Sequence, residues 1–84
     1  MVKLLYFASV RETVGLSEET VKLPVEVKSV SDLMSWQQQR GPEYKSAFCT
    51  TRQIRAAIDH QHANPDALVN GAHEIAFFPP VTGG

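Results

Sequence analysis

The sequence predicts an α+β domain in which a mixed sheet of about four to five strands is covered by one main helix. Apolar runs at residues 2–8 and 73–78 carry hydrophobic side chains on both faces, as expected for central strands. Between these runs, one segment has helical spacing behind a capping pattern. With 84 residues the chain has room for a single domain, expected at residues 1–80 with a tail at 81–84.

The N-terminal third is predicted to form a hairpin. The strand at residues 2–8 is followed by a turn at 11–15, where Gly15 is free to adopt a positive φ. Alternating apolar residues resume from residue 19 to 27 and indicate the second strand. Because Pro24 cannot donate a ladder hydrogen bond, this strand is expected at a sheet edge or a bulge.

The main helix is predicted to begin with a capping box. The hydroxyl of Ser29 is placed to accept from the amide of Asp32, whose carboxylate reaches back. The helix is expected to span about residues 30–40, with Gly41 in the left-handed C′ position and Pro42 preventing continuation. Pro42 also fits the first position of a second, short helix at residues 42–49.

The remaining elements are a strand at residues 54–59, turns at 64–66 and 70–71, and the last strand at 73–78. If the first and last strands lie side by side at the centre, the helix must cross one face of the sheet to cover it. That arrangement is the β-grasp fold.

Composition excludes several classes of function. A net charge of -1 gives no field that would hold nucleic acid or an anionic membrane, so neither is expected as a partner. No signal peptide or stretch of about 18 apolar residues is visible, which predicts a cytoplasmic protein. The single cysteine, Cys49, cannot form an intrachain disulfide and is expected in a buried or half-buried structural position.

The body of the chain offers little for catalysis. His60, His62 and His73 give at most three ligands, with no cysteine near them to complete a tetrahedral zinc site, so no metal is expected. No glycine-rich phosphate loop or strained nucleophile turn is present. We therefore expect this chain to bind no cofactor itself.

The C-terminal residues carry the chemical signal. Gly83 and Gly84 have no Cβ, so a terminal glycine carboxylate can enter a narrow active site. Pro79 and Pro80 favour an extended path that projects a mobile tail, with a reach of roughly 20 Å at about 3.3 Å per residue. A reactive tail of this kind needs a partner enzyme to activate it.

Two aromatic residues predict where such a partner binds. If the first and last strands of the chain pair, Phe7 and Phe78 lie with Leu5 on the sheet face opposite the helix. There they leave an uncovered apolar patch. Arg11 is then placed to pair with a carboxylate of the partner. The alternative is that the loop at residues 64–69 covers this patch as a second layer.

Several stretches together resemble a known family. They are Leu-Leu-Tyr-Phe-Ala at residues 4–8, Arg11-Glu12, Gly15, Ser29-Val30, and Ala-Phe-Phe-Pro-Pro-Val-Thr-Gly-Gly at 76–84. The chain resembles the small subunit of molybdopterin synthase, the MoaD family of ubiquitin-like sulfur carriers. It departs from the family's usual pattern between residues 59 and 73, which leaves the partner-facing details of that segment open.

The resemblance implies a non-catalytic, sulfur-donating subunit of an enzyme complex. A partner activating enzyme would use ATP to adenylate Gly84, and a sulfur donor protein would supply the sulfur of a C-terminal thiocarboxylate. The tail would then enter the large synthase subunit, within a heterotetramer, and give its sulfur to cyclic pyranopterin monophosphate. Gly83 and Gly84 would be the reacting residues. The partner interface would comprise Phe7, Arg11, Phe78, Pro79, Pro80, Val81 and Thr82.

Three other functions stay open on the sequence. A sulfur carrier of the thiamine pathway shares the fold, the diglycine and the activation chemistry. A ubiquitin-like protein modifier would join Gly84 to a lysine of a target. A third possibility is an inert interaction module with a disordered tail.

Overall fold

The computed structural model describes residues 1–49 and 54–79. Within these ranges the chain forms a five-stranded sheet and three helices, which confirms the predicted α+β class. In chain order the elements are β1 (Val2–Tyr6), α1 (Ala8–Val14), β2 (Glu18–Val21), α2 (Val30–Gln38), α3 (Pro42–Phe48), β3 (Arg55–Ile58), β4 (Gln61–Ala63) and β5 (Glu74–Phe78).

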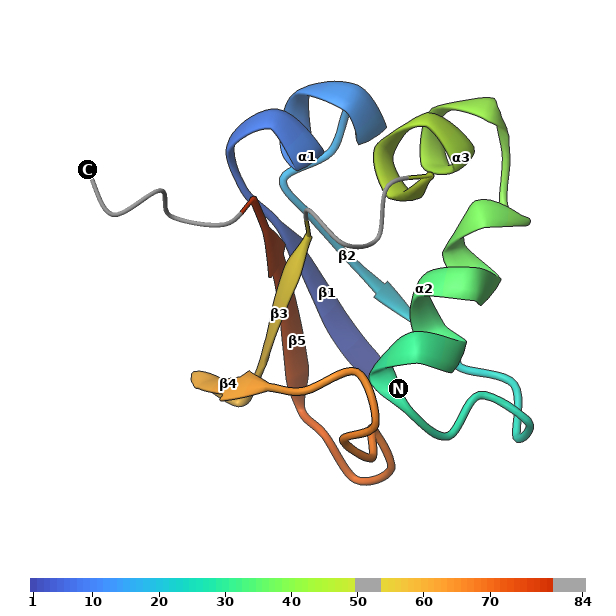
Figure 1. Cartoon of the computed structure of the whole chain (residues 1–84), viewed down its shortest axis with the longest axis vertical. Helices are drawn as coiled ribbons and strands as arrows, with labels where there is room; N and C mark the ends of the chain where they lie inside the picture. The colour runs from blue at the N-terminus through green and yellow to red at the C-terminus, as the bar shows by residue number, and fades with distance from the viewer. Residues whose placement is uncertain (50–53, 80–84) are drawn as a thin grey trace.

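The sheet has the strand order β2-β1-β5-β3-β4 (Figure 1). The first and last strands, β1 and β5, pair in parallel at its centre, and the other neighbours are antiparallel. The helices lie together on one side of the sheet in Figure 1. This arrangement is the predicted β-grasp, with α2 as the longest helix and with α1 and α3 sharing in the cover.

The core lies between the sheet and the helices. Leu4, Ile75 and Phe77 point into it from the two central strands and are fully buried. They meet Leu33 of α2 and Phe48 of α3, which are equally buried. Each apolar side chain of this size contributes roughly 1.5–3 kcal/mol on burial, so the central strands are strongly anchored to the helical layer.

The link between β1 and β2 differs from the prediction. The predicted turn at residues 11–15 is the second half of α1, which buries Val10 and Val14 at the i, i+4 spacing of one helical face. Gly15 does take a positive φ of 89°, but as the left-handed cap of this helix. The two strands pair antiparallel as predicted, although a helix joins them in place of a tight turn.

The second strand is shorter than predicted. β2 ends at Val21, and Pro24 lies in the loop that follows and not within the strand. The apolar alternation continues to Val27, but Val25 is 90% exposed while Val27 is buried. The apolar alternation after Val21 therefore reflects contacts of individual loop residues with the core and not the pairing of a strand.

The predicted capping box at the start of α2 is confirmed. The Ser29 hydroxyl accepts from the Asp32 amide at 3.1 Å, and the Asp32 carboxylate accepts from the Ser29 amide at 3.2 Å. The helix ends at Gln38, two residues earlier than predicted, with Gln39 as a right-handed C-cap. Gly41 is the N-cap of α3 and not a left-handed end of α2.

The predicted short helix at residues 42–49 is α3. It begins at Pro42, as predicted, and buries Tyr44 and Phe48. Cys49 follows the helix and is exposed, so the expected structural position of this thiol is wrong. Its Sγ lies 3.3 Å from the carbonyl of Ser46, a local contact at the helix end.

A fifth strand appears where a loop was predicted. Asp59 and His60 both adopt positive φ, 49° and 73°, so they turn β3 tightly into β4. That conformation is typical of the two-residue hairpin turns whose twist matches the flanking strands. His62 therefore lies on a strand, opposite Ala57, and not in a loop.

Candidate functional site

The sheet face that points away from the helices is the candidate interaction site, and we call it the open face. Its centre is a cross-strand row in which Ala76 of β5 is flanked by Leu5 of β1 and Ala57 of β3. Phe78 follows at the end of β5, opposite Arg55. All four apolar side chains are half-buried. The members of the open face are Lys3, Leu5, Glu18, Arg55, Ala57, His62, Glu74, Ala76 and Phe78.

The loop at residues 64–69 does not cover this face. Its backbone bonds to the start of α2 and the residues before it, on the helical side of the sheet. The carbonyl of Ala67 accepts from the amide of Val30, and the amide of Val69 donates to the carbonyl of Lys28. The second layer considered from the sequence is therefore absent among the described residues.

The end of β5 lies next to the start of α1. The amide of Phe7 donates to the carbonyl of Phe77 at 3.1 Å, one position beyond the last registered pair of the two central strands. Phe7 is 48% exposed, and Phe78 and Pro79 are half-buried beside the point where the described chain ends. Arg11 is exposed one helical turn after Phe7, to whose carbonyl its amide donates.

This backbone contact brings Phe7 to the end of β5 where Phe78 and Pro79 lie. In Figure 1 the start of α1 lies beside that end of β5. Phe7 is the N-cap of α1 and not a strand residue, which differs from the predicted strand at residues 2–8. The other predicted site residues, Pro80, Val81, Thr82, Gly83 and Gly84, lie outside the described residues.

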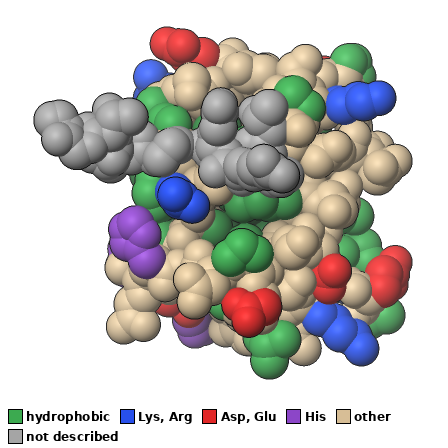
Figure 2. Space-filling view, in the orientation of Figure 1, with side chains coloured by type: hydrophobic (Ala, Val, Ile, Leu, Met, Phe, Trp, Pro, Cys, Tyr) green, Lys and Arg blue, Asp and Glu red, His purple; other side chains and the backbone are tan. Residues whose placement is uncertain are grey.

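The charges of the open face are not evenly paired. Lys3 Nζ lies 3.7 Å from Glu18 Oε2, and His60 Nε2 lies 3.0 Å from Glu74 Oε1. Arg55 is exposed and forms no ion pair with any described residue. In Figure 2, basic and histidine side chains lie near hydrophobic ones on the left of the view.

The three histidines have separate surroundings. His60 contacts Glu74, and the ring of His62 packs edge-on against Phe78 with centroids 5.4 Å apart. The backbone amide of His73 donates to the carboxylate of Asp59 at 3.0 Å. The backbone amide of Glu74, which donates to the same carboxylate at 2.9 Å, and then that of His73 hold the pKa of Asp59 below its usual range. Among residues 1–49 and 54–79, no three histidine, cysteine or carboxylate side chains gather as metal ligands.

Several grooves lie on the described surface, and the linings of two are informative about catalysis. One, of about 470 Å³ between α2 and β3, is lined by Ser31, Ser35 and also Arg55, but by no histidine. The other, of about 520 Å³, is lined by the loop after β2 and has His73 but no serine or cysteine. Neither lining brings a nucleophile together with a base, so neither has the arrangement required for nucleophilic catalysis.

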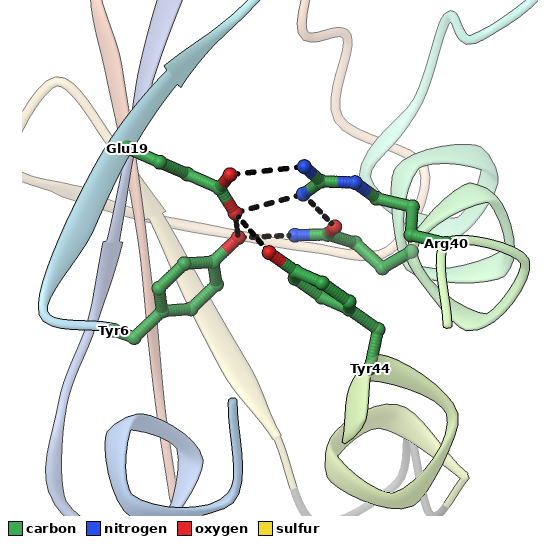
Figure 3. A network of polar contacts seen from close by, with 5 residues as sticks. Tyr6, Glu19, Arg40 and Tyr44 are labelled. Carbon is green, nitrogen blue, oxygen red and sulfur yellow. Dashed lines mark hydrogen bonds and ion pairs between the residues drawn. The ribbon is translucent and has the colours of Figure 1, made fainter. Parts of the chain in front are cut away.

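A polar network was missed in the sequence (Figure 3). The carboxylate of Glu19 accepts both Nη1 and Nη2 of Arg40, at 2.8 and 2.9 Å, and the hydroxyls of Tyr6 and Tyr44, at 2.7 and 2.9 Å. Gln37 is fully buried and completes the network by donating to Tyr6 and accepting from Arg40. These five side chains thus connect β1, β2, α2 and α3. Arg40 takes part from its position just after the end of α2.

The network shifts the acidity of its members. The guanidinium of Arg40 holds the pKa of the Glu19 carboxyl below its ordinary value, with further help from the Tyr6 and Tyr44 hydroxyls. Burial raises the pKa of both Tyr6 and Tyr44, and the neighbouring Glu19 carboxylate raises them further. Arg40 also lies 4.9 Å from the centroid of the Trp36 ring and 4.2 Å from that of Tyr44.

The network supports the open face from within. The Tyr6 ring stacks on Phe77 with centroids 6.0 Å apart, and Phe48 packs edge-on against both. Phe77 directly precedes Phe78, so the hydroxyl bonds of Tyr6 help to fix the end of β5. Sequence spacing carries no signal for the bonds of Tyr6 and Tyr44 in this network, because their partners lie 13 to 31 residues away.

Within the part of the chain that the structure describes, no helix combines the length and the apolar character needed to cross a membrane.

Comparison with known proteins agrees with the fold. The chain is similar to the solved structure of SAMP1 from Haloferax volcanii, with a TM-score of 0.71 and 22% identity over 99% of this chain and 98% of that one. At this identity the likeness concerns the fold alone, and it supports the β-grasp assignment.

The sequence comparisons show the family. The molybdopterin synthase sulfur carrier subunit of Mycosarcoma maydis is 33% identical over 99% of this chain and 92% of its own length. The subunit of the same description from Escherichia coli strain K12 is 31% identical over the whole of both chains. The ThiS family profile matches residues 4–84. This chain therefore belongs to the ThiS family of ubiquitin-like sulfur carriers, as its resemblance to MoaD proteins predicted.

Proposed function

We propose that this chain is the sulfur carrier subunit of a molybdopterin synthase, and that Gly84 is the residue that carries the sulfur. The observation that supports this most directly is the full-length match to sulfur carrier subunits of molybdopterin synthase. The family match extends through Gly84, so the diglycine belongs to the shared sequence. Both of these relatives are described as molybdopterin synthase sulfur carrier subunits, and neither description names one of the other functions considered.

The proposed chemistry places every catalytic group on partner proteins. A carboxylate is a poor electrophile, so an activating enzyme first joins the Gly84 carboxylate to the α-phosphate of ATP and releases pyrophosphate. Sulfur from a donor protein then displaces AMP and leaves a thiocarboxylate. Inside the large synthase subunit, this sulfur is transferred to cyclic pyranopterin monophosphate and Gly84 returns to a carboxylate. A second thiocarboxylated carrier supplies the other of the two sulfurs of the molybdopterin dithiolene.

In this scheme the β-grasp body positions the reacting end. The open face and the exposed Phe7 lie beside the end of β5, from which residues 80–84 continue. A partner that covers the open face would therefore bind next to the start of the tail. Holding a reacting end in the correct place is a recognised source of rate enhancement.

The direct test is the intact mass of the protein after co-production with the activating enzyme and sulfur donor of its own organism. We expect the mass increase of one oxygen replaced by sulfur, located at Gly84 by fragmentation. A chain that lacks Gly84 should gain no sulfur and form no molybdopterin, while its thermal unfolding stays that of the wild type. Molybdopterin formation by the shortened chain would refute the proposal.

Replacing Gly83 tests the narrow passage separately. Isoleucine at this position makes the C-terminal segment wider and restricts its backbone, so thiocarboxylation should slow. An unchanged rate for Gly83→Ile would show that the partner's channel is not narrow, and would leave the role of Gly84 intact.

The same samples distinguish the alternatives. A protein modifier would produce high-mass conjugates that contain a lysine of a target joined to Gly84. A thiamine-pathway carrier would acquire the thiocarboxylate but would not restore molybdopterin formation to cells that lack their own carrier.

A further inference from the structure

The open face changes character along its length. Two pairs of acidic and basic groups contact one another away from the tail end. Lys3 lies near Glu18, which is opposite Leu5 at the β2 side of the face, and His60 lies near Glu74 at the end farther from the tail. The centre is apolar. At the tail end, Phe78 has two nitrogen-bearing neighbours from β3 and β4: Arg55 is opposite it in register, and the ring of His62 packs edge-on against it.

The acids on and around this face are already engaged. Glu18 and Glu74 contact basic groups, as described above, and Asp59 accepts the backbone amides of His73 and Glu74 at 3.0 and 2.9 Å. None of the described residues offers Arg55 a carboxylate within ion-pair distance. Arg55 is an exposed residue in the free chain.

A partner that covers Phe78 also removes water from Arg55, because the two residues are direct cross-strand neighbours. Burial of an unpaired charge is costly, and a guanidinium cannot escape the cost by losing its proton. Since residues 1–49 and 54–79 supply no carboxylate to Arg55, we assign the compensating acceptor to the partner. The planar fork of arginine is best matched by a carboxylate, which it can bind through two parallel hydrogen bonds.

We propose that the partner surface that covers the open face carries a carboxylate opposite Arg55, set at the edge of an apolar area that receives Phe78. This inference rests on the proposed function, and the partner it concerns is the large synthase subunit. It identifies Arg55 as a specificity determinant. A partner with an apolar or basic group at that position binds more weakly.

The test is the affinity of the full chain for the large synthase subunit of its own organism, measured by calorimetry at low and at high salt. Arg55→Glu should weaken binding by about tenfold or more at low salt, and the loss should shrink as salt rises. The affinity of Arg55→Gln should lie between those of the wild type and Arg55→Glu. Lys45→Glu is the matched control, because it makes the same charge change on exposed α3, on the helical side.

A second arm identifies the carboxylate. Single Asp→Lys and Glu→Lys variants of the large subunit should include one that restores binding to Arg55→Glu while weakening binding to the wild type. Thermal unfolding of Arg55→Glu should match the wild type, because the residue is exposed. This check separates lost affinity from lost folding.

The outcomes are distinct. Equal affinity of Arg55→Glu and the wild type would overturn this inference and leave the proposed function standing. Equal losses for Arg55→Glu and Lys45→Glu would do the same, since they would show only a response to net charge. A wild-type chain that gains no sulfur and does not bind the large subunit would overturn the proposed function, and this inference with it.

Discussion

Ala8 holds an unusual backbone conformation at the junction of β1 and α1. Its φ is 53°, in the left-handed region that residues with a Cβ rarely adopt. Phe7, one of the candidate interface residues, directly precedes it. The chain therefore accepts local strain at the point where it turns from the central strand into the helix beside the open face.

Relief of this strain gives a prediction. Ala8→Gly should raise the free energy of unfolding by about 1 kcal/mol, because glycine adopts a positive φ without a steric penalty. Urea denaturation measures the change. Ser9→Gly is the matched control in the same exposed turn, and it should lower stability by about 0.5 kcal/mol, since Ser9 has no positive φ. A loss of stability in Ala8→Gly would show that the junction is unstrained.

Glu19 is the centre of the polar network, and its replacement should be costly. In Glu19→Gln the carboxylate that binds Arg40, Tyr6 and Tyr44 becomes a neutral amide. We expect a loss of about 2 kcal/mol, because bonds to a charged acceptor disappear and a half-buried guanidinium loses its partner. Glu18→Gln is the control, since Glu18 is exposed and makes only a 3.7 Å ion pair.

The same residue predicts a pH dependence. The pKa of Glu19 is lowered in the folded state, so its contribution to stability is complete above the pKa of an unfolded glutamate, about 4.3. It is lost as the pH falls through the lower folded value, because protonation breaks the contact with Arg40. The difference in unfolding free energy between wild type and Glu19→Gln should therefore narrow below about pH 4. A constant difference across this range would contradict the assignment.

At the scale of single elements, α2 depends on its capping box. Ser29→Ala should cost about 1 kcal/mol of unfolding free energy, since the amide of Asp32 loses its acceptor. Ser35 is exposed and lies in the middle of the same helix. Ser35→Ala should leave the unfolding free energy unchanged or raise it slightly, because alanine is the better helix former. Equal effects of the two changes would mean that the cap contributes nothing to stability. Thermal unfolding followed by circular dichroism compares them.

Short sequence signals correctly predicted the helices and strands whose positions depend on local residues. The capping box located α2, Pro42 located the start of α3, and the doubly apolar runs located the two central strands. The helix α1 was missed because its residues were interpreted as a turn. The spacing of Val10 and Val14 before Gly15 was the available signal for a short helix with a left-handed cap.

Other features had weaker signals. The turn between β3 and β4 uses Asp59 and His60 in place of the Asn-Gly or Asp-Gly pair that normally marks it, so β4 was missed. Alternation past Pro24 extended β2 too far, because loop residues that contact the core imitate a strand pattern. The apolar residues of the open face followed from strand alternation. The position of Arg55 beside Phe78 depends on strand register, which spacing alone does not supply.

At the scale of the whole molecule, two adjacent phenylalanines should separate stability from association. Phe77 is fully buried in the core, and Phe78 is half-buried on the open face. Phe77→Ala should lower the unfolding free energy by about 3–5 kcal/mol. Phe78→Ala should cost the fold much less, but should weaken binding to the large synthase subunit by about 2 kcal/mol or more.

Calorimetry of binding, alongside thermal unfolding, decides the roles of the two residues. Equal losses of stability and affinity in Phe78→Ala would assign this residue to the core. An effect on neither property would show that the partner binds elsewhere on the sheet.

The parallel pairing of β1 with β5 also governs when the domain can fold during synthesis. The central strand pair joins the first strand to the last, so its contacts span nearly the whole chain and close late. Until β5 leaves the ribosome, β1 lacks its inner neighbour and the helices have only part of a sheet to pack against. The last strand before the C-terminal glycines thus completes the fold, and a prematurely terminated chain would lack both those glycines and a finished sheet.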